Sequence, residues 1–259
     1  MEAERRGSSL VREVSVVRIA VVENMENTHL GTLGWALAES GAELQWFRPW
    51  RDGALPLGAH DHDGLIVLGG KQSAVDDAAY PYLPRLAGLM RRFGDADKAV
   101  LGICLGGQLL ARAYGAKNLL GNAREFAWTT LDVTPEGMAD PLFRGIGARF
   151  ESFQWHVDTF SLPGNAVRLV SGSVVANQCF RIGRAAYGVQ FHFEASAQVV
   201  ASWSVEYRDV VEQFAPGWLD RYPETAARHA AVADQAGHAI ARAFVQSVRP
   251  ARNAAAAGC

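Results

Sequence analysis

The sequence predicts an α/β fold, in which a doubly wound, mostly parallel sheet is flanked by helices. Three observations support this prediction. Short β-branched runs alternate with helical segments through the first half of the chain, as they do in successive βαβ units. These runs are continuously apolar, which is typical of strands covered on both faces. A glycine follows each predicted helix of this half, where chains often leave a helix.

The first half is predicted to contain four strands and three helices. The third strand leads into Gly69 and Gly70, and the fourth leads into Cys104. In chain order the elements are strand 17–22, helix 28–40, strand 43–47, strand 64–68, helix 82–93, strand 99–103 and helix 105–114.

The second half changes character, because short strands follow one another with few helices between them. Some of these strands are expected to form a small antiparallel extension of the sheet. Residues 218–248 then supply one or two amphipathic helices that close the fold. The predicted strands are 126–133, 150–154, 167–171, 178–182 and 186–191.

The composition is that of an ordinary globular protein. Hydrophobic residues make up 49% of the 259 residues and charged residues 20%, which excludes a disordered or fibrous chain. The 25 basic and 27 acidic residues give a net charge of −2. That balance gives no electrostatic support for nucleic-acid binding, so no nucleic-acid partner is expected.

One domain is expected over residues 14–250, because no linker, charge block or repeat interrupts it. Residues 1–13 and 251–259 are expected to be flexible tails. The N-terminus lacks the apolar core of a secretory signal, and no apolar run reaches the ~18 residues of a membrane span. The cysteines form no CxxC pair, so no disulfide, metal or other cofactor is expected. We therefore expect a cytoplasmic protein without a membrane partner.

The segment GICLGGQ, residues 102–108, is a candidate nucleophile turn. It follows a buried strand and begins a helix, and Gly102 and Gly106 flank Cys104 at two residues on either side. A nucleophile on a sharp strand-to-helix turn needs such small neighbours. The N-terminus of the following helix favours a thiolate. The alternative, a buried and inert cysteine at a strand end, is common for this residue type.

A thiol nucleophile needs a base, and that base needs an orienting group. The segment GVQFHFE, residues 188–194, supplies both, since His192 and Glu194 lie on the same side of an extended chain. The imidazole can take the thiol proton and return it to a leaving amine, while the carboxylate fixes the tautomer. In isolation His192 would be read as a buried core histidine. Its pairing with Glu194 and with the cysteine turn favours a catalytic role.

Acyl transfer also needs N–H donors for a developing oxyanion. The N–H of Leu105, immediately after the candidate nucleophile, is one candidate. The loop Leu68-Gly69-Gly70-Lys71 is the second, because its two glycines let the backbone approach a substrate closely. Taken alone, this loop would be an ordinary glycine-rich turn.

Together these segments resemble the class I glutamine amidotransferase family. The segment around Cys104 matches the family pattern G-x-C-x-G-x-Q, and residues 188–194 match G-V-Q-F-H-x-E. The order of glycine loop, cysteine, and then histidine with glutamate is also that of the family. The resemblance covers roughly residues 17–194, and it implies the flavodoxin-like fold of class I amidotransferases.

The resemblance implies a Cys-His-Glu triad. Cys104 would attack the side-chain amide of glutamine, and the γ-glutamyl thioester would then be hydrolysed by water. His192 would act as general base and acid, with Glu194 orienting it. The N–H groups of Gly70 and Leu105 would stabilise the oxyanion.

The resemblance also implies three substrate-binding residues. Gln108 would contact the bound glutamine. The stretch SFQWHVD, residues 152–158, is similar to the family's S-H-x-D stretch, in which His156 and Asp158 match. The serine expected before the histidine is replaced by Trp155. A hydrogen bond between the two residues within the loop is an equally good explanation of the match.

Two departures concern positions where the family usually has proline. Phe193 stands between His192 and Glu194, where proline would fix φ and help to aim the carboxylate. Phe193 is expected to add an aromatic wall to the pocket. Lys71 stands after the two glycines of the loop. An exposed lysine is expected there, within reach of an acidic substrate group.

The resemblance leaves the ammonia acceptor open. No P-loop is present, so an ATP-using synthase would be a separate protein that takes the released ammonia. The favoured alternative is a stand-alone, ATP-independent hydrolase of γ-glutamyl peptides or γ-glutamyl amines. A non-catalytic regulatory relative is also considered, although Cys104, His192 and Glu194 are all present. In each catalytic case the substrate is a small γ-glutamyl compound.

Overall fold

The computed structural model describes residues 16–121 and 123–249. The expected tails, and with them Cys259, lie outside the described residues. Within the described part of the chain, nine strands form one mixed sheet in the order β2-β1-β3-β4-β11-β10-β9-β6-β7. The strands are β1 (Arg18–Val22), β2 (Glu43–Phe47), β3 (Gly64–Val67), β4 (Ala99–Ile103), β6 (Glu125–Val133), β7 (Arg149–His156), β9 (Val167–Ser171), β10 (Cys179–Ile182) and β11 (Ala186–Val189).

The first five strands in this order form the parallel half of the sheet. β1 pairs in parallel with β2 and β3, β3 with β4, and β4 with β11. The pairing of β4 with β11 sets Gly102 opposite Gly188, so the residues that follow these two strands meet at one edge of the sheet. This arrangement is the predicted doubly wound fold, and its strand order is flavodoxin-like.

The remaining strands form the predicted antiparallel extension. β10 pairs antiparallel with β11 and β9, and β6 pairs antiparallel with β9 and β7. The β6–β7 ladder runs from Glu125 opposite His156 to Asp132 opposite Arg149. A separate two-stranded sheet joins β5 (Asn118–Leu119) to β8 (Thr159–Phe160). This small sheet lies next to the loop that carries residues 157 and 158.

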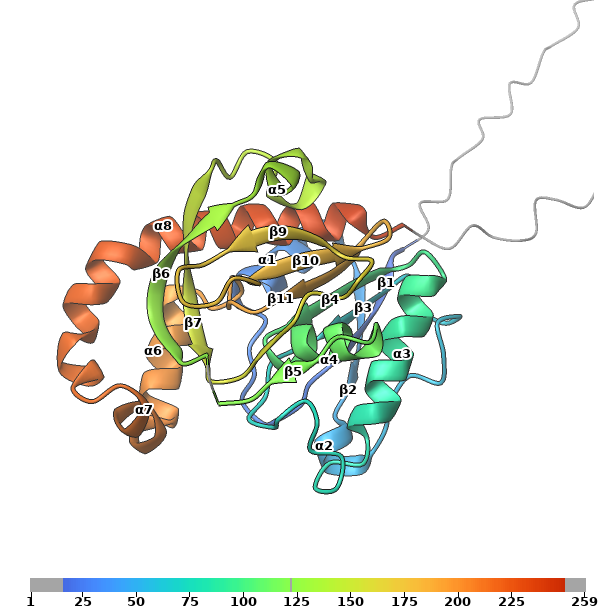
Figure 1. Cartoon of the computed structure of the whole chain (residues 1–259), viewed down its shortest axis with the longest axis horizontal. Helices are drawn as coiled ribbons and strands as arrows, with labels where there is room; N and C mark the ends of the chain where they lie inside the picture. Colours follow the sequence, from blue (N-terminus) through green and yellow to red (C-terminus); the bar gives the residue numbers. More distant parts are fainter. Residues whose placement is uncertain (1–15, 122, 250–259) are drawn as a thin grey trace, which may run out of the picture.

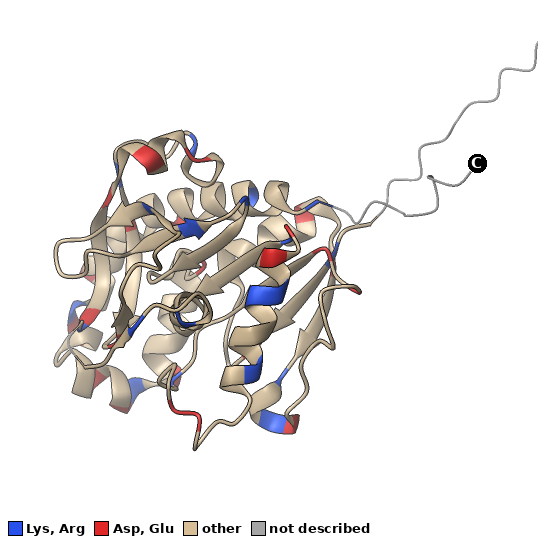
Figure 2. Ribbon diagram, turned by 45° about the vertical axis from the view of Figure 1, so that its right-hand side comes forward, with Lys and Arg blue, Asp and Glu red and all other residues tan. Residues whose placement is uncertain are grey.

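Helices cover both faces of the sheet (Figure 1). On one face α1 packs against α8, and on the other α3 packs against α4, which also contacts β4 and β11. Basic and acidic residues lie interspersed on the helices (Figure 2), in line with the net charge of −2. The helices are α1 (Gly31–Ser40), α2 (Pro49–Asp52), α3 (Leu83–Asp95), α4 (Leu105–Ala113), α5 (Pro135–Ala139), the 3-10 turn Pro141–Phe143, α6 (Ala197–Glu206), α7 (Arg208–Phe214) and α8 (Trp218–Ser247).

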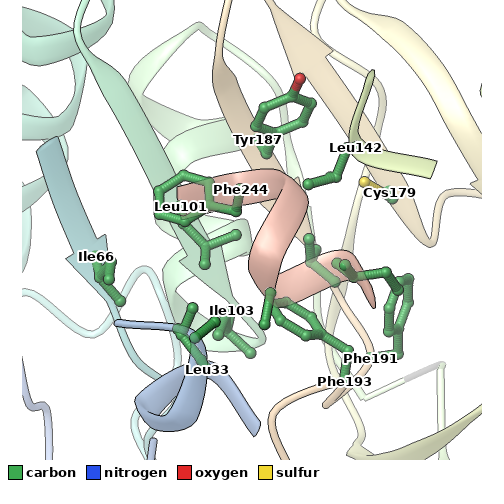
Figure 3. Packing of buried hydrophobic residues seen from close by; sticks show 14 of the residues in the cluster. Leu33, Ile66, Leu101, Ile103, Leu142, Cys179, Tyr187, Phe191, Phe193 and Phe244 are labelled. Carbon is green, nitrogen blue, oxygen red and sulfur yellow. The ribbon is translucent and has the colours of Figure 1, made fainter. Parts of the chain in front are cut away.

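The continuously apolar strands divide their side chains between two cores, as expected of a sheet covered on both faces. Alternate residues of β1 illustrate this division. Ile19 and Val21 face the core beneath α1 and α8, and Ala20 and Val22 face the core beneath α3 and α4. Figure 3 shows the first of these cores, in which Phe244 of α8 lies among side chains from the sheet.

The C-terminal segment is one continuous helix of 30 residues, α8, within the expected one or two helices, although Pro223 lies inside it. Helices α6 and α7 were not predicted. They contain only ten and seven residues, too few for a sustained apolar period to distinguish them from a loop.

Candidate active site

Cys104 occupies the sharp turn between β4 and α4, with backbone angles of φ 52° and ψ −107°. A positive φ is strained for a residue with a side chain, and such strain concentrates at functional sites. The two flanking glycines make the turn sterically feasible. A Cβ on Gly102 would lie 2.3 Å from the Gly106 carbonyl oxygen, and one on Gly106 would lie 2.1 Å from the Val67 carbonyl oxygen.

His192 reaches Cys104 from a short crossing between two strands. β11 ends at Val189, two residues before the predicted end, because the chain there leaves the parallel half and crosses toward β7. The His192 N–H donates to the Phe153 carbonyl oxygen at 2.8 Å, which holds the crossing against β7. A Cβ on Gly69 would contact both the His192 ring and the Cys104 Cβ, at 3.2 and 3.6 Å. The structure therefore brings Cys104, His192 and the glycine loop together.

Glu194 completes the cluster. Its Oε1 lies 2.6 Å from Nδ1 of His192, and both side chains are buried. Burial lowers the pKa of His192, but the Glu194 carboxylate and the Cys104 sulfur raise it by more. The net effect is an increase in the pKa of His192 from 6.5 to about 10. The imidazole therefore carries a proton at neutral pH.

The backbone around Glu194 is held by α1 rather than by a proline. The Thr32 Oγ1 donates to the Phe193 carbonyl oxygen at 2.9 Å, and the Thr32 N–H donates to the Glu194 carbonyl oxygen at 3.0 Å. Gly31 also contacts this segment, since a Cβ there would lie 1.8 Å from the Glu194 carbonyl oxygen. The Thr32 clamp, as we call these two hydrogen bonds, fixes the segment that a proline would otherwise stiffen.

Phe193 does not line the pocket, contrary to the expectation from the sequence. Its ring is buried in the core beneath α1 and α8, beside Leu33 and Phe191 (Figure 3). The chain is not extended here, although the sequence suggested that it would be, but turns at residues 193–194, where the Ala195 N–H donates to the His192 carbonyl oxygen at 3.2 Å. This turn directs Phe193 into the core while Glu194 faces His192. Phe193 thus anchors the loop in the core.

The glycine loop lies beside the turn of Cys104. A Cβ on Gly70 would clash with Gln72 and Asn24 and would lie 3.0 Å from the Leu105 side chain. Asn24 holds the loop by donating to the Leu68 carbonyl oxygen at 2.7 Å. Gly70 therefore lies close to the Leu105 side chain. Lys71 is exposed at the cavity edge.

Gln108, His156 and Asp158 also come together, but their contacts are mainly with one another. Gln108 Nε2 donates to the Asp158 carbonyl oxygen at 2.9 Å, and Nδ1 of His156 lies 3.2 Å from the same oxygen. Nε2 of His156 lies 3.2 Å from the buried Glu125 carboxylate. The Asp158 carboxylate accepts from the Gly121 N–H at 2.8 Å. These contacts fix the 156–158 loop beside Cys104.

Gln190 contacts the nucleophile candidate directly and was given no role from the sequence. Its Nε2 lies 3.8 Å from the Cys104 sulfur, and its Oε1 accepts from Gln108 at 3.3 Å. The signal was available, because Gln190 lies in the same motif as His192. An amide N–H at this position can donate a hydrogen bond to the sulfur.

Comparison with known proteins identifies the family. Residues 28–201 match the model of the glutamine amidotransferase class-I family. The chain belongs to this family.

Relatives agree with this assignment. The glutamine amidotransferase-like protein YfeJ of Salmonella typhimurium is 30% identical over 187 residues, 71% of this chain and 77% of YfeJ. One subunit of the glutamine-hydrolysing GMP synthase of Methanothermobacter thermautotrophicus is 31% identical over 138 residues, 52% of this chain and 67% of that protein. The crystal structure of a glutamine amidotransferase from Thermotoga maritima superposes with a TM-score of 0.80 at 26% identity, covering 90% of this chain and 98% of that one.

The site of this class I amidotransferase opens into a cavity of about 430 Å³ above Cys104. Part of its wall lies beyond the segment that matches the family model, which ends at residue 201. Sequence reasoning missed this part, because its residues belong to no motif. The cavity is lined by Met25, Asn27, Thr28, His29, Leu68, Gly69, Gly70, Lys71, Gln72, Ser73, Cys104, Gln108, Trp155, His156, Val157, Asp158, His192, Glu194, Trp203, Tyr207, Val210 and Phe214.

Metal clusters and membrane-crossing helices are both absent from the described part of the chain. Among residues 16–121 and 123–249, no cluster of three or more His, Cys, Asp or Glu side chains is arranged to hold a metal ion. In the same ranges, no helix combines the length and the apolar character that crossing a bilayer requires. The second buried cysteine of the described chain, Cys179, lies in β10, and burial raises the pKa of its thiol well above the ordinary value.

Proposed function

We propose that this class I amidotransferase hydrolyses a γ-glutamyl amide bond through a γ-glutamyl thioester on Cys104. The observation that carries the proposal is the strained turn at Cys104 facing His192, whose imidazole is paired with Glu194. A thiol activated by a neighbouring imidazolium and oriented by a carboxylate is the arrangement that acyl transfer requires.

In the first step His192 holds the proton of Cys104, and the sulfur attacks the γ-carbonyl carbon. A C–S bond forms, and the carbonyl oxygen takes the negative charge toward the N–H groups of Gly70 and Leu105. The C–N bond then breaks as His192 gives its proton to the departing nitrogen. The products of this step are ammonia or an amine and the γ-glutamyl thioester.

In the second step water attacks the thioester. His192, now neutral, takes a proton from the water, and the C–S bond breaks to release glutamate and restore the thiolate. Glu194 keeps the imidazole oriented through both steps. Gln190 supports the sulfur as it regains its negative charge.

The glutamyl end of the substrate is assigned to the 156–158 loop and Gln108. In this proposal the loop presents backbone groups to the amino-acid end, and the contacts of Gln108, His156 and Asp158 set its position. His156 therefore acts through loop geometry, because both of its ring nitrogens face protein atoms.

Two versions of this function differ in the leaving group. The similarity to a subunit of a GMP synthase supports a glutaminase that passes ammonia to a separate synthase protein. The alternative is a stand-alone hydrolase of γ-glutamyl peptides or amines. The apolar and aromatic side chains of Trp203, Tyr207, Val210 and Phe214 in the cavity favour the stand-alone hydrolase, because ammonia has no apolar surface to place against them.

The test is glutamate release by the purified full chain without ATP, measured with glutamine, γ-glutamyl amines and γ-glutamyl peptides. Cys104→Ala serves as the control, and its folding is checked by circular dichroism. Release from at least one compound, lost in Cys104→Ala, is the expected result. Glutamate release that persists in Cys104→Ala would contradict the proposal.

A further inference from the structure

Four side chains from α6, α7 and the residue between them form a wall of the cavity, which we call the α6–α7 wall. Trp203, Tyr207, Val210 and Phe214 make up this wall. Trp155 lies against it, with its ring centroid 5.7 Å from that of Trp203 and 5.8 Å from that of Tyr207. The wall thus presents apolar and aromatic side chains inside the candidate active site.

The wall adjoins the group that protonates the leaving nitrogen. The ring of Trp203 packs edge-on against His192, with centroids 5.3 Å apart and an angle of 81° between the planes. In the proposed mechanism the leaving nitrogen takes its proton from His192. A substituent on that nitrogen therefore extends from the His192 ring along the α6–α7 wall.

The wall also contains apolar surface that the fold does not bury. Val210 remains 51% exposed although it lines the cavity. Apolar side chains lining a concave site commonly bind an apolar part of a ligand. Ammonia, the leaving group of glutamine, has no apolar surface to place there.

The charges of the cavity do not suit a cationic substituent. Asp158 and Glu194 are the carboxylates among the described lining residues. Glu194 is paired with His192, and Asp158 accepts the Gly121 N–H. Lys71, at the cavity edge, adds a positive charge. Aromatic rings can hold cations, but here both carboxylates that line the cavity already accept a hydrogen bond from the protein.

We propose that the α6–α7 wall is a leaving-group subsite that selects γ-glutamyl amides of bulky, uncharged apolar or aromatic amines. This inference rests on the proposed function, because it uses His192 as the proton donor to the leaving nitrogen. It makes the amine side of the bond, rather than the glutamyl side, the part of the substrate that this chain distinguishes.

The test compares kcat/KM for four amides that share the γ-glutamyl group: glutamine, γ-glutamylbutylamide, γ-glutamylputrescine and γ-glutamylbenzylamide. The butyl and putrescine compounds differ by one terminal amine. We expect benzylamide to exceed glutamine by about tenfold or more, since an apolar group filling a pocket contributes effects of that size. We also expect kcat/KM for γ-glutamylbutylamide to exceed that for γ-glutamylputrescine.

A pair of matched variants locates the effect. Val210→Asp is expected to lower the ratio of kcat/KM for benzylamide to that for glutamine by about fivefold or more. Val205→Asp is the control, because Val205 on α6 is 76% exposed and does not line the cavity. The control is expected to leave the ratio unchanged.

Three results would overturn the subsite while leaving the proposed hydrolysis intact. The first is a kcat/KM for glutamine equal to that for γ-glutamylbenzylamide. The second is a higher kcat/KM for γ-glutamylputrescine than for γ-glutamylbutylamide. The third is an unchanged ratio of kcat/KM for γ-glutamylbenzylamide to that for glutamine in Val210→Asp. A different result, no glutamate release from any of the four amides by the folded protein, would contradict both the proposed function and the subsite.

Discussion

The parallel half of the sheet and the segments beyond it position their side chains in different ways. Cys104 and Gly70 follow directly from the ends of β4 and β3, where open α/β sheets bind ligands. His192 and Glu194 lie instead on a crossing held by β7 on one side and by α1 on the other. The nucleophile is therefore placed by strand geometry, and its base is placed by tertiary contacts.

This difference has a consequence for tolerance to substitution. The turn at Cys104 is enclosed by backbone atoms, so an added side-chain atom there would clash with them. The crossing at His192 depends on a few hydrogen bonds and on the burial of Phe193. Substitutions at the turn of Cys104 should disrupt folding or chemistry strongly. Substitutions at the crossing should change the orientation of His192 to a smaller extent.

The largest expected effect is that of Cys104→Ala on turnover. Loss of the nucleophile should reduce kcat by about 10⁴-fold or more, because no other group of the site replaces it. The thermal unfolding midpoint should stay close to that of the unsubstituted protein, since Ala occupies less space in the same turn. Glutamate release and circular dichroism measure the two quantities. Retained activity would remove Cys104 from the mechanism.

The next effect concerns the packing of the turn. Gly106→Ala should lower the free energy of unfolding by about 3 kcal/mol, because the new Cβ would lie 2.1 Å from the Val67 carbonyl oxygen. Gly164→Ala is the matched control, with open space around the added Cβ, and should change stability by about 0.5 kcal/mol or less. Chemical denaturation measures both. Equal stabilities for the two variants would show that the turn is not tightly enclosed.

Glu194→Gln tests the crossing through pH dependence. Glu194 raises the pKa of His192 to about 10, so the imidazolium persists at neutral pH and is lost as the pH rises through about 10. The stability that the raised pKa contributes is present in full below pH 6.5 and declines toward pH 10. Glu194→Gln should lower kcat by about 10²-fold and move its alkaline limb to lower pH. An alkaline limb that stays in place would contradict the pairing.

The smallest expected effect is that of the Thr32 clamp. Thr32→Val removes the hydrogen bond to the Phe193 carbonyl oxygen, worth about 1 kcal/mol, so kcat should fall by about fivefold. Thr32→Ser keeps the hydroxyl and should restore most of the activity. The alkaline limb of kcat should shift in Thr32→Val and return in Thr32→Ser. A loss of activity in Thr32→Ser with none in Thr32→Val, which keeps a methyl group but lacks the hydroxyl, would mean that packing of the methyl group and not the hydrogen bond matters.

The same division explains what could be predicted from the sequence. The doubly wound fold and the turn at Cys104 followed from local patterns, since apolar runs and glycines act within a few residues. The burial of Phe193 depended on α1 and α8, which contact it from distant parts of the chain. The α6–α7 wall was missed because its residues, among them Trp203 and Val210, share only a cavity and no motif.

The most direct test of the proposed mechanism is to trap the γ-glutamyl group on the protein. The protein is mixed with a γ-glutamyl amide, quenched in acid within the first turnover and digested for mass spectrometry. We predict the mass of one γ-glutamyl group on the peptide containing Cys104 and none on the peptide containing the buried Cys179. Turnover with no adduct on Cys104 in any quench interval, or an adduct on another residue, would contradict the mechanism.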